Sequence, residues 1–268
     1  MDGRRDVENL WDKLLSWYEE NDIREGVVSF SGGKDSTLVL DSAMEAMDDV
    51  KAVIFDSEFM AEADLSFAVK KVKDMDVEFD VIEVNVLDED RIVENPEDRC
   101  YFCKMKMFEE LKDEENILEG TNRSEVSGHR PGYQAVKEIA RSPLLETGIG
   151  EEEVRMILKW RGHDNWNRAS GSCLATRVPT GETIDQERLK RIERVEKRLS
   201  KFGYKQLRVR DHNKKAVIEV LPDEIDKLVK NREKIIERLK DEGYEKIYVD
   251  LMGYKTGPIS QDRNNRQM

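Results

Sequence analysis

The stretch Val27-Val28-Ser29-Phe30-Ser31-Gly32-Gly33-Lys34-Asp35-Ser36-Thr37 decides the fold of this chain. Its first four residues have β-propensity, a Ser-Gly-Gly turn follows, and a helical pattern begins at Ser36 or Thr37. A strand, a glycine turn and a helix N-terminus together bring backbone N–H groups and a helix dipole to face a phosphate. Ser31 and Ser36 add hydroxyl donors, and the two glycines let the backbone approach the anion. The stretch therefore predicts a phosphate-binding loop.

This loop differs from two common nucleotide motifs. It has neither the Gly-x-x-x-x-Gly-Lys-Ser/Thr pattern nor the Gly-x-Gly-x-x-Gly fingerprint. Read as Ser-Gly-Gly-x-Asp-Ser, residues 31–36 resemble the PP-loop of the ATP-pyrophosphatase superfamily, whose members cleave ATP between the α and β phosphates and adenylate a substrate. The alternative interpretation is an ordinary glycine turn between a strand and a helix.

Composition sets broad limits on the function. The 268 residues suffice for one large domain, or for a large and a small one, and the net charge of −13 argues against a protein whose main task is to bind nucleic acid. No apolar run approaches the roughly 20 residues that span a bilayer, and the polar N-terminus lacks an apolar signal core. Three cysteines, an odd number, do not form a disulfide framework, so we expect a cytoplasmic protein.

Buried strands alternate with helical stretches along the first half of the chain. After an amphipathic helix over residues 6–20, the pattern predicts strands at 27–30, 51–57, 79–86 and 116–122. This alternation predicts an α/β fold with a doubly wound parallel sheet covered on both faces. Ligands on such sheets bind outside the carboxyl ends of the strands. The loop, Asp56, Ser57, Gly120 and Thr121 all fall at those ends, so we expect them to bind the nucleotide.

The cysteines are the second signal. Cys100 and Cys103 lie three residues apart at the start of a predicted helix, and Cys173 follows in a segment of small and polar residues. Arg177 is close in sequence and would favour the thiolate of Cys173. Three interpretations are open: unrelated buried thiols, a structural zinc completed by a histidine, or an iron–sulfur cluster with one iron lacking a protein ligand. The histidines available to zinc are His129, His163 and His212.

Several further motifs, in order along the chain, carry a family resemblance. They are Asn95-Pro-x-Asp-Arg-Cys-Tyr-Phe-Cys-Lys104, Glu119-Gly-Thr-Asn122, Arg130-Pro-Gly132, Arg141-Ser-Pro-Leu144, Ser172-Cys-Leu-Ala-Thr-Arg-Val-Pro179 and the ending Gly253–Gly257. With the loop, they resemble the LarE family, ATP-dependent sulfur transferases of nickel-pincer nucleotide biosynthesis. The sequence departs from the family at Lys34, in the variable position of the loop, and over 125–129. The second departure leaves the role of His129 open, and we expect it to be a surface-loop histidine.

The resemblance implies a reaction and its cofactors. ATP would adenylate a carboxylate of a pyridinium biscarboxylate mononucleotide, and sulfur would then convert it to a thiocarboxylate. In the mechanism that we favour, Asp35 positions a Mg²⁺ or supports the loop. Two sulfur sources occur in the family: a cysteine at the position of Cys173 that loses its own sulfur and becomes dehydroalanine, or a 4Fe-4S cluster carrying an extra sulfide. Because this chain has Cys100 and Cys103 as well, we favour the cluster, held by all three cysteines.

A small second domain is expected after the turn residues at Pro179–Gly181. We expect residues 1–179 to form the PP-loop domain, 180–257 a small α+β substrate or oligomerisation domain, and 258–268 a polar tail. The apolar pattern of residues 180–257 predicts a helix, paired strands at 206–211 and 215–221, one helix over 225–239 and a last strand at 246–251. Arg208 and Arg210 lie on the same face of one predicted strand. Two guanidinium groups on one face favour the binding of a phosphate or carboxylate, and the alternative interpretation is a pair of solvated charges.

The resemblance adds substrate residues and leaves two alternative functions. Arg208, Arg210, Glu196 and Glu219 fall where LarE-type proteins bind substrate phosphate and metal, and we assign Arg177 to the substrate as well. The expected partners are a small-molecule nucleotide, a sulfide or sulfur donor, and further copies of the chain. A tRNA thiolation enzyme is disfavoured by the negative charge, because tRNA binding would call for a basic surface. A nucleotide-binding sensor that holds a cluster without catalysis would release no pyrophosphate.

Overall fold

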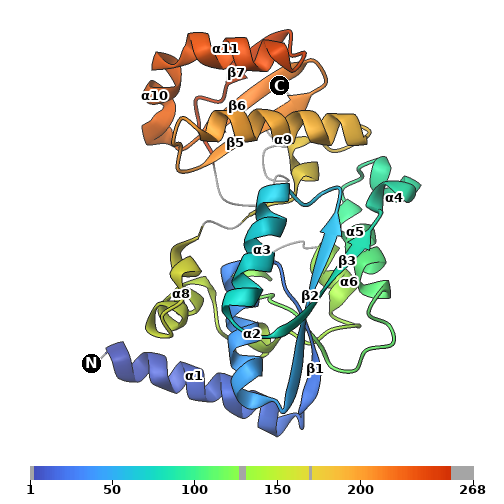
Figure 1. Ribbon diagram of the computed structural model, residues 1–268, viewed down its shortest axis with the longest axis vertical. Coiled ribbons are helices and arrows are strands. Elements are labelled where there is room, and N and C mark those ends of the chain that lie inside the picture. The colour runs from blue at the N-terminus through green and yellow to red at the C-terminus, as the bar shows by residue number, and fades with distance from the viewer. Residues whose placement is uncertain (1–2, 127–130, 169–170, 255–268) are drawn as a thin grey trace, which may run out of the picture. The chain divides into compact units, whose positions relative to one another are not determined.

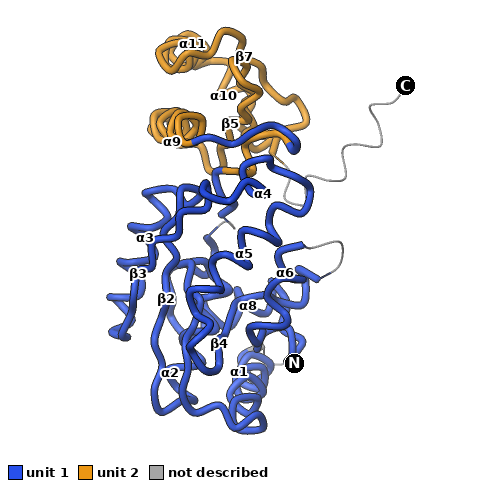
Figure 2. The backbone as a smooth tube through the Cα atoms, turned by 90° about the vertical axis from the view of Figure 1, so that its right-hand side faces the viewer, with its two compact units in different colours: residues 1–174, 180–185 blue, residues 175–179, 186–268 orange. Residues whose placement is uncertain are grey.

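The computed structural model describes residues 3–126, 131–168 and 171–254, and within them the chain divides into two compact units. Unit 1 comprises residues 1–174 and 180–185, and unit 2 comprises residues 175–179 and 186–268 (Figure 2). The expected motif Arg130-Pro-Gly132 lies partly outside the described residues, as does the ending Gly253–Gly257. His129 and the tail 258–268 lie wholly outside them. Among the described residues, none of the helices combines the length and the apolar character needed to cross a membrane.

Unit 1 contains a four-stranded parallel sheet in the order β3-β2-β1-β4, which confirms the predicted fold class. Strands β1, β2 and β3 are labelled in Figure 1. Its strands are β1 (Glu25–Ser29), β2 (Asp49–Ser57), β3 (Glu78–Val84) and β4 (Ile117–Leu118). Its helices are α1 (Gly3–Glu20), α2 (Lys34–Ala46), α3 (Glu62–Asp74), α4 (Asp90–Val93), α5 (Arg99–Glu109), α6 (Pro131–Val136), α7 (Pro143–Glu146) and α8 (Glu151–Trp160).

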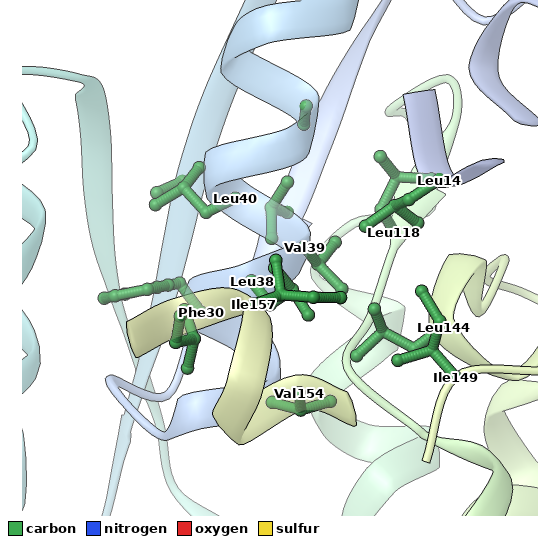
Figure 3. Close-up of a cluster of buried hydrophobic side chains, with 14 of the residues drawn as sticks. Leu14, Phe30, Leu38, Val39, Leu40, Leu118, Leu144, Ile149, Val154 and Ile157 are labelled. Atoms are coloured by element: carbon green, nitrogen blue, oxygen red, sulfur yellow. The ribbon is translucent and has the colours of Figure 1, made fainter. Parts of the chain in front are cut away.

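Both faces of this sheet are covered, because consecutive strand residues point to opposite sides and both are apolar. Val28 packs in a cluster that contains side chains of α1, α2 and α8, including Leu14, Leu38 and Ile157 (Figure 3). Its neighbour Val27 packs in a second cluster with side chains of α5 and α6. Two apolar layers of helices therefore fix the sheet from either side and hold its carboxyl edge in place.

The strand order places a switch point between β1 and β4. From β1 the chain winds outward through β2 to β3, and it then returns to add β4 on the other side of β1. Loops that leave two adjacent strands in opposite directions open a crevice at their carboxyl ends, where ligands bind in such sheets. The loop after β1 and the segment Glu119–Asn122 after β4 border this point.

Unit 2 contains a three-stranded sheet in the order β5-β6-β7 with helices on one face. Its elements are α9 (Gln186–Ser200), β5 (Leu207–His212), β6 (Lys215–Val220), α10 (Ile225–Lys230), α11 (Arg232–Asp241) and β7 (Lys246–Val249). Val209 and Ile218 alternate with polar residues and pack against Val195, Leu228 and Leu239 of the helices. Because the side-chain period of a strand is two, Arg208, Arg210 and Glu219 lie on the opposite face.

Several predicted boundaries were wrong, and three of them have a local cause. The helix after the glycine turn begins at Lys34 rather than at Ser36 or Thr37, because Gly33 is extended and serves as its N-cap. The fourth strand has only two residues, since Glu119 and the three residues after it form a polar loop instead. The single helix predicted over 225–239 is two helices, interrupted at Asn231, whose side-chain amide donates to the Lys227 carbonyl oxygen.

Candidate active site

The loop between β1 and α2 is held in shape by its own hydroxyl groups. The Ser31 and Ser36 hydroxyls are 3.1 Å apart, and the Ser36 hydroxyl accepts from the backbone N–H of Ser31 at 3.2 Å. The Thr37 hydroxyl donates to the Gly33 carbonyl oxygen at 2.8 Å. The first N–H groups of a helix have no intrahelical acceptor and lie at the positive end of its dipole. The loop therefore presents a preformed anion site at the start of α2.

Two glycines are required by close contacts. Gly32 has a φ of +71°, and a Cβ there would lie 2.9 Å from the Ala68 Cα of α3. A Cβ on Gly120 would lie 2.9 Å from the backbone nitrogen of Ser36. Gly120 thus lets the end of β4 lie directly against the first turn of α2, which explains why a glycine stands in the Glu119–Asn122 motif.

The side chains after β4 form a polar brace for this contact. The Asn122 amide donates to one carboxylate oxygen of Asp35 at 2.8 Å. The buried carboxylate of Glu119 accepts from the Thr121 hydroxyl at 2.7 Å and from the Ser142 hydroxyl. Gly120 and Thr121 therefore lie beside the loop as expected, with the Thr121 hydroxyl engaged by Glu119.

Asp56 and Ser57 occupy the last two positions of β2, next to β1. Ser57 is buried and its carbonyl oxygen accepts from the backbone N–H of Met60. The Asp56 carboxylate makes no hydrogen bond or ion pair within the described parts of the chain. It is the kind of hard oxygen ligand that a magnesium ion takes.

The three cysteines belong to unit 1 and are free thiols. Cys100 and Cys173 are exposed, and Cys103 is partly buried. Burial, together with the neighbouring Cys173 and Cys100 thiolates, raises the pKa of the Cys103 thiol to about 12. The Arg99 guanidinium donates to the Cys100 sulfur at 3.6 Å. The Cys103 thiol thus lies within electrostatic range of Cys100, three residues earlier, and of Cys173, which is 70 residues further along the chain.

The three thiols are candidate ligands for a metal ion or cluster. Within residues 3–126, 131–168 and 171–254, no group of three or more His, Cys, Asp or Glu side chains is arranged to hold a metal ion. The donor set nevertheless matches an iron–sulfur cluster, which takes cysteine thiolates. A structural zinc would need a histidine ligand. The His163 Nε2 atom instead lies 3.1 Å from an Asp41 carboxylate oxygen.

In unit 2, three guanidinium groups share a polar cluster with two carboxylates. Buried Arg177 forms a two-point ion pair with Glu196 at 3.0 and 3.1 Å. Arg210 does the same with Glu219 at 2.8 Å for both bonds. Within the described part of the chain Arg208 forms no ion pair, and burial together with the positive charges of Arg177 and Arg210 lowers its pKa. One cation of the cluster is therefore available for an anionic ligand.

Two contacts of the loop could not be found from sequence. Asn165, beyond α8, is buried and donates to the Gly32 carbonyl oxygen at 3.3 Å and to the Thr37 hydroxyl at 2.8 Å. Lys34 is also buried and lies 3.3 Å from the Glu151 carboxylate of α8. The residues of each contact lie more than 100 positions apart, and no sequence pattern links them. Only the acidic start of α8, a usual feature of a helix N-terminus, could have drawn attention to Glu151.

Comparisons with known proteins agree with this geometry. The sequence profile described as "Queuosine biosynthesis protein QueC" matches residues 25–94, which include the phosphate loop. The chain is 30% identical over 265 residues to the uncharacterized protein slr1717 of Synechocystis sp., covering 95% of this chain and 98% of the relative. It is 30% identical over 238 residues to the uncharacterized protein MJ0830 of Methanocaldococcus jannaschii, covering 86% and 90%.

A third relative carries a descriptive name. The pyridinium-3,5-bisthiocarboxylic acid mononucleotide synthase of Lactiplantibacillus plantarum is 28% identical over 256 residues, with 92% of this chain and 93% of the synthase covered. These near full-length matches span both units. With a phosphate loop at the switch point of a parallel sheet, they establish that the chain belongs to the LarE-type family of PP-loop enzymes, which are ATP-dependent sulfur transferases.

Proposed function

We propose that this enzyme adenylates a carboxylate of pyridinium-3,5-biscarboxylic acid mononucleotide and converts it to a thiocarboxylate. One observation carries the proposal: a phosphate loop and three cysteines, of which Cys103 interacts electrostatically with the other two, belong to the same compact unit. The loop suits the cleavage of ATP, and the thiols suit the delivery of sulfur. The substrate follows from the name of the Lactiplantibacillus plantarum relative, which is a bisthiocarboxylic acid mononucleotide synthase.

In the first step a carboxylate oxygen of the acceptor attacks the α-phosphorus of ATP, and the bond to the oxygen bridging to the β-phosphorus breaks. Pyrophosphate leaves with that bonding pair. The backbone N–H groups at the start of α2, with the Ser31 and Ser36 hydroxyls, would hold the departing phosphates and stabilise their growing charge. Asp35 and Asp56 would hold a magnesium ion, which supplies further positive charge at the phosphates. Gly32, Gly33 and Gly120 keep the approach to the phosphates open.

In the second step a sulfur nucleophile attacks the acyl carbon of the adenylate, and AMP departs with the bonding pair. We propose that Cys100, Cys103 and Cys173 bind a 4Fe-4S cluster. When bound, such a cluster supplies an iron without a protein ligand, able to carry sulfide. Arg99 would stabilise the negative charge on the Cys100 sulfur, to which it already donates.

Unit 2 would bind the acceptor's phosphate. Among the described residues no carboxylate forms an ion pair with Arg208, while Glu196 and Glu219 orient Arg177 and Arg210 beside it. Guanidinium groups bind phosphate oxygens in a planar, two-point geometry. We therefore assign ATP chemistry to the N-terminal domain, residues 1–179, and acceptor binding to the domain of residues 180–257, with Arg177 contributed from the connecting segment.

The test is a turnover assay with anaerobically purified protein. With ATP, Mg²⁺, sulfide and the biscarboxylate mononucleotide, we expect stoichiometric pyrophosphate and AMP, and a product in which oxygen has been replaced by sulfur. Iron and sulfide analysis should give cluster stoichiometry in the wild type and lose it in Cys100→Ser, Cys103→Ser and Cys173→Ser. The sequence contains three cysteines in all, so no other thiol can replace a substituted one, and each single substitution should abolish cluster binding.

Three other results would redirect the proposal. Dehydroalanine at position 173 without iron would establish the sacrificial route, for which exposed Cys173 is accessible. Tight tRNA binding at moderate salt would point to tRNA thiolation. ATP binding without pyrophosphate release in the presence of the acceptor would leave a nucleotide-binding sensor.

A further inference from the structure

Lys34 stands in the phosphate loop, but its side chain points into the protein. It is only 3% exposed, and its ammonium lies 3.3 Å from a Glu151 oxygen and 3.7 Å from an Asp35 oxygen. A lysine that grips phosphate must reach the ligand, whereas a buried ammonium is tolerated only with compensating partners. The placement of Lys34 therefore indicates a role inside the protein, toward Asp35 and Glu151.

These contacts belong to a closed polar ring. Asp35 accepts from the Asn122 amide at 2.8 Å, and the Asn122 side-chain oxygen accepts from the backbone N–H of Ser124 at 2.9 Å. The Ser124 hydroxyl in turn accepts from the backbone N–H of Glu151 at 3.0 Å, and the Glu151 carboxylate returns to Lys34. The ring joins the start of α2, the loop after β4 and the start of α8.

The ring fixes the carboxylate of Asp35 from both sides. One oxygen accepts from Asn122, and the other faces the Lys34 ammonium. An unconstrained aspartate beside the phosphates of ATP would be turned away by like charge, so its orientation depends on these partners. Glu151 holds the ammonium that holds Asp35, although Glu151 lies 116 residues further along the chain, on α8.

We propose that Lys34 and Glu151 are positioning residues for the ATP-dependent step, which orient Asp35 toward the magnesium-bound phosphates. This inference rests on the proposed function in so far as ATP occupies the loop. A displacement of a reacting or orienting group by a fraction of an ångström lowers turnover more than binding. The pair should therefore influence kcat and magnesium use rather than the affinity for the nucleotide itself.

The experiment compares Glu151→Gln with Glu152→Gln, the same chemical change at an exposed neighbour in the first turn of α8. For Glu151→Gln we expect kcat of pyrophosphate release to fall about 10-fold, with KM for ATP within about 3-fold. Lys34→Met should behave alike, and Lys34→Arg should recover part of kcat. Glu152→Gln should match the wild type.

A binding readout separates this inference from the proposed function. Calorimetry with the non-cleavable analogue α,β-methylene-ATP should show that Glu151→Gln needs more Mg²⁺ for half-maximal nucleotide binding, even if no acceptor is turned over. Unchanged kcat and magnesium dependence in Glu151→Gln would overturn the proposal. So would a loss of activity that only parallels the fraction of unfolded protein. If Glu151→Gln does not fold, Ser124→Ala opens the same ring more mildly and carries the same expectation.

Discussion

At the scale of single residues, the three arginines Arg177, Arg208 and Arg210 of unit 2 differ in whether their guanidinium group is paired with a carboxylate. Arg177 and Arg210 are each paired with a carboxylate through two hydrogen bonds. Arg208 instead donates to the Leu207 carbonyl oxygen, and its buried Nε has no hydrogen-bond partner among the described residues. A partly buried cation without an ion-pair partner costs free energy in the ligand-free protein. A bound phosphate would offset that cost.

Arg208→Gln and Arg210→Gln should therefore have opposite profiles. Arg208→Gln should leave the free energy of unfolding unchanged or raise it, yet weaken binding of the acceptor about 10- to 100-fold, because a charge-assisted hydrogen bond is lost. Arg210→Gln should lower the free energy of unfolding by about 1–3 kcal/mol, because Glu219 loses its partner. Calorimetry and urea denaturation measure the two quantities. Equal destabilisation by both variants would contradict this division.

Gly120→Ala should damage the loop without removing any hydrogen-bonding group. The added methyl would meet backbone atoms of Ser36 and Asp35 at 2.9 and 3.1 Å, and backbone cannot move aside as a side chain can. We expect a loss of about 1–3 kcal/mol in unfolding free energy and a clear fall in ATP cleavage. Gly171→Ala is the control, since the nearest described atom outside its chain neighbours, an Asp64 carboxylate oxygen, would lie 3.9 Å from the added Cβ. Equal behaviour of the two variants would refute the close approach of β4 to α2.

At the scale of elements, the alternation of strands and helices was predictable because each element carries its own periodic pattern. The phosphate loop and its position at a carboxyl edge follow from that pattern and from chain connectivity, whereas the order of the strands in the sheet came from the structure. The interruption at Asn231 was not predictable, because no Gly or Pro marks it and the apolar spacing continues through it. The ring from Lys34 to Glu151 was also hidden, since tertiary folding alone brings these residues together.

Arg161 and His163, at the end of α8, contact the Asp41 carboxylate of α2, and this contact should make the free energy of unfolding depend on pH. Burial tends to raise the pKa of Asp41, but hydrogen bonds from His163 and Arg161 outweigh it and lower the pKa below the usual 3.8. A carboxyl group with a lowered pKa stabilises the fold above its unfolded-state pKa, and that contribution is lost as the pH falls through its folded-state pKa.

Asp41→Asn should accordingly lower the free energy of unfolding at neutral pH by about 1–2 kcal/mol. The difference from the wild type should shrink as the pH is lowered below the usual aspartate value. Urea denaturation at a series of pH values measures it, with Asp48→Asn, an exposed aspartate in the turn after α2, as the control. A difference that stays constant with pH would show that the Asp41 charge contributes nothing.

At the scale of the whole molecule, the two units have separate hydrophobic cores, and this should make their stabilities separable. Val28 of β1 is fully buried in the core of unit 1, and Val209 of β5 is fully buried in the core of unit 2. Units with independent cores open independently, so a cavity in one raises the opening rate of that unit alone. The comparison requires only the intact chain.

Val209→Ala should lower the stability of unit 2 by about 2 kcal/mol through lost packing. Hydrogen exchange of the intact protein should then accelerate in β5, β6 and β7, while β1 and β2 keep wild-type protection and the nucleotide analogue still binds. Val28→Ala should give the reverse pattern and weaken nucleotide binding, because β1 carries the phosphate loop. If Val209→Ala accelerated exchange equally in β1 and β2, the chain would unfold as one cooperative body. The assignment of ATP chemistry and acceptor binding to separately stable units would then have to be abandoned.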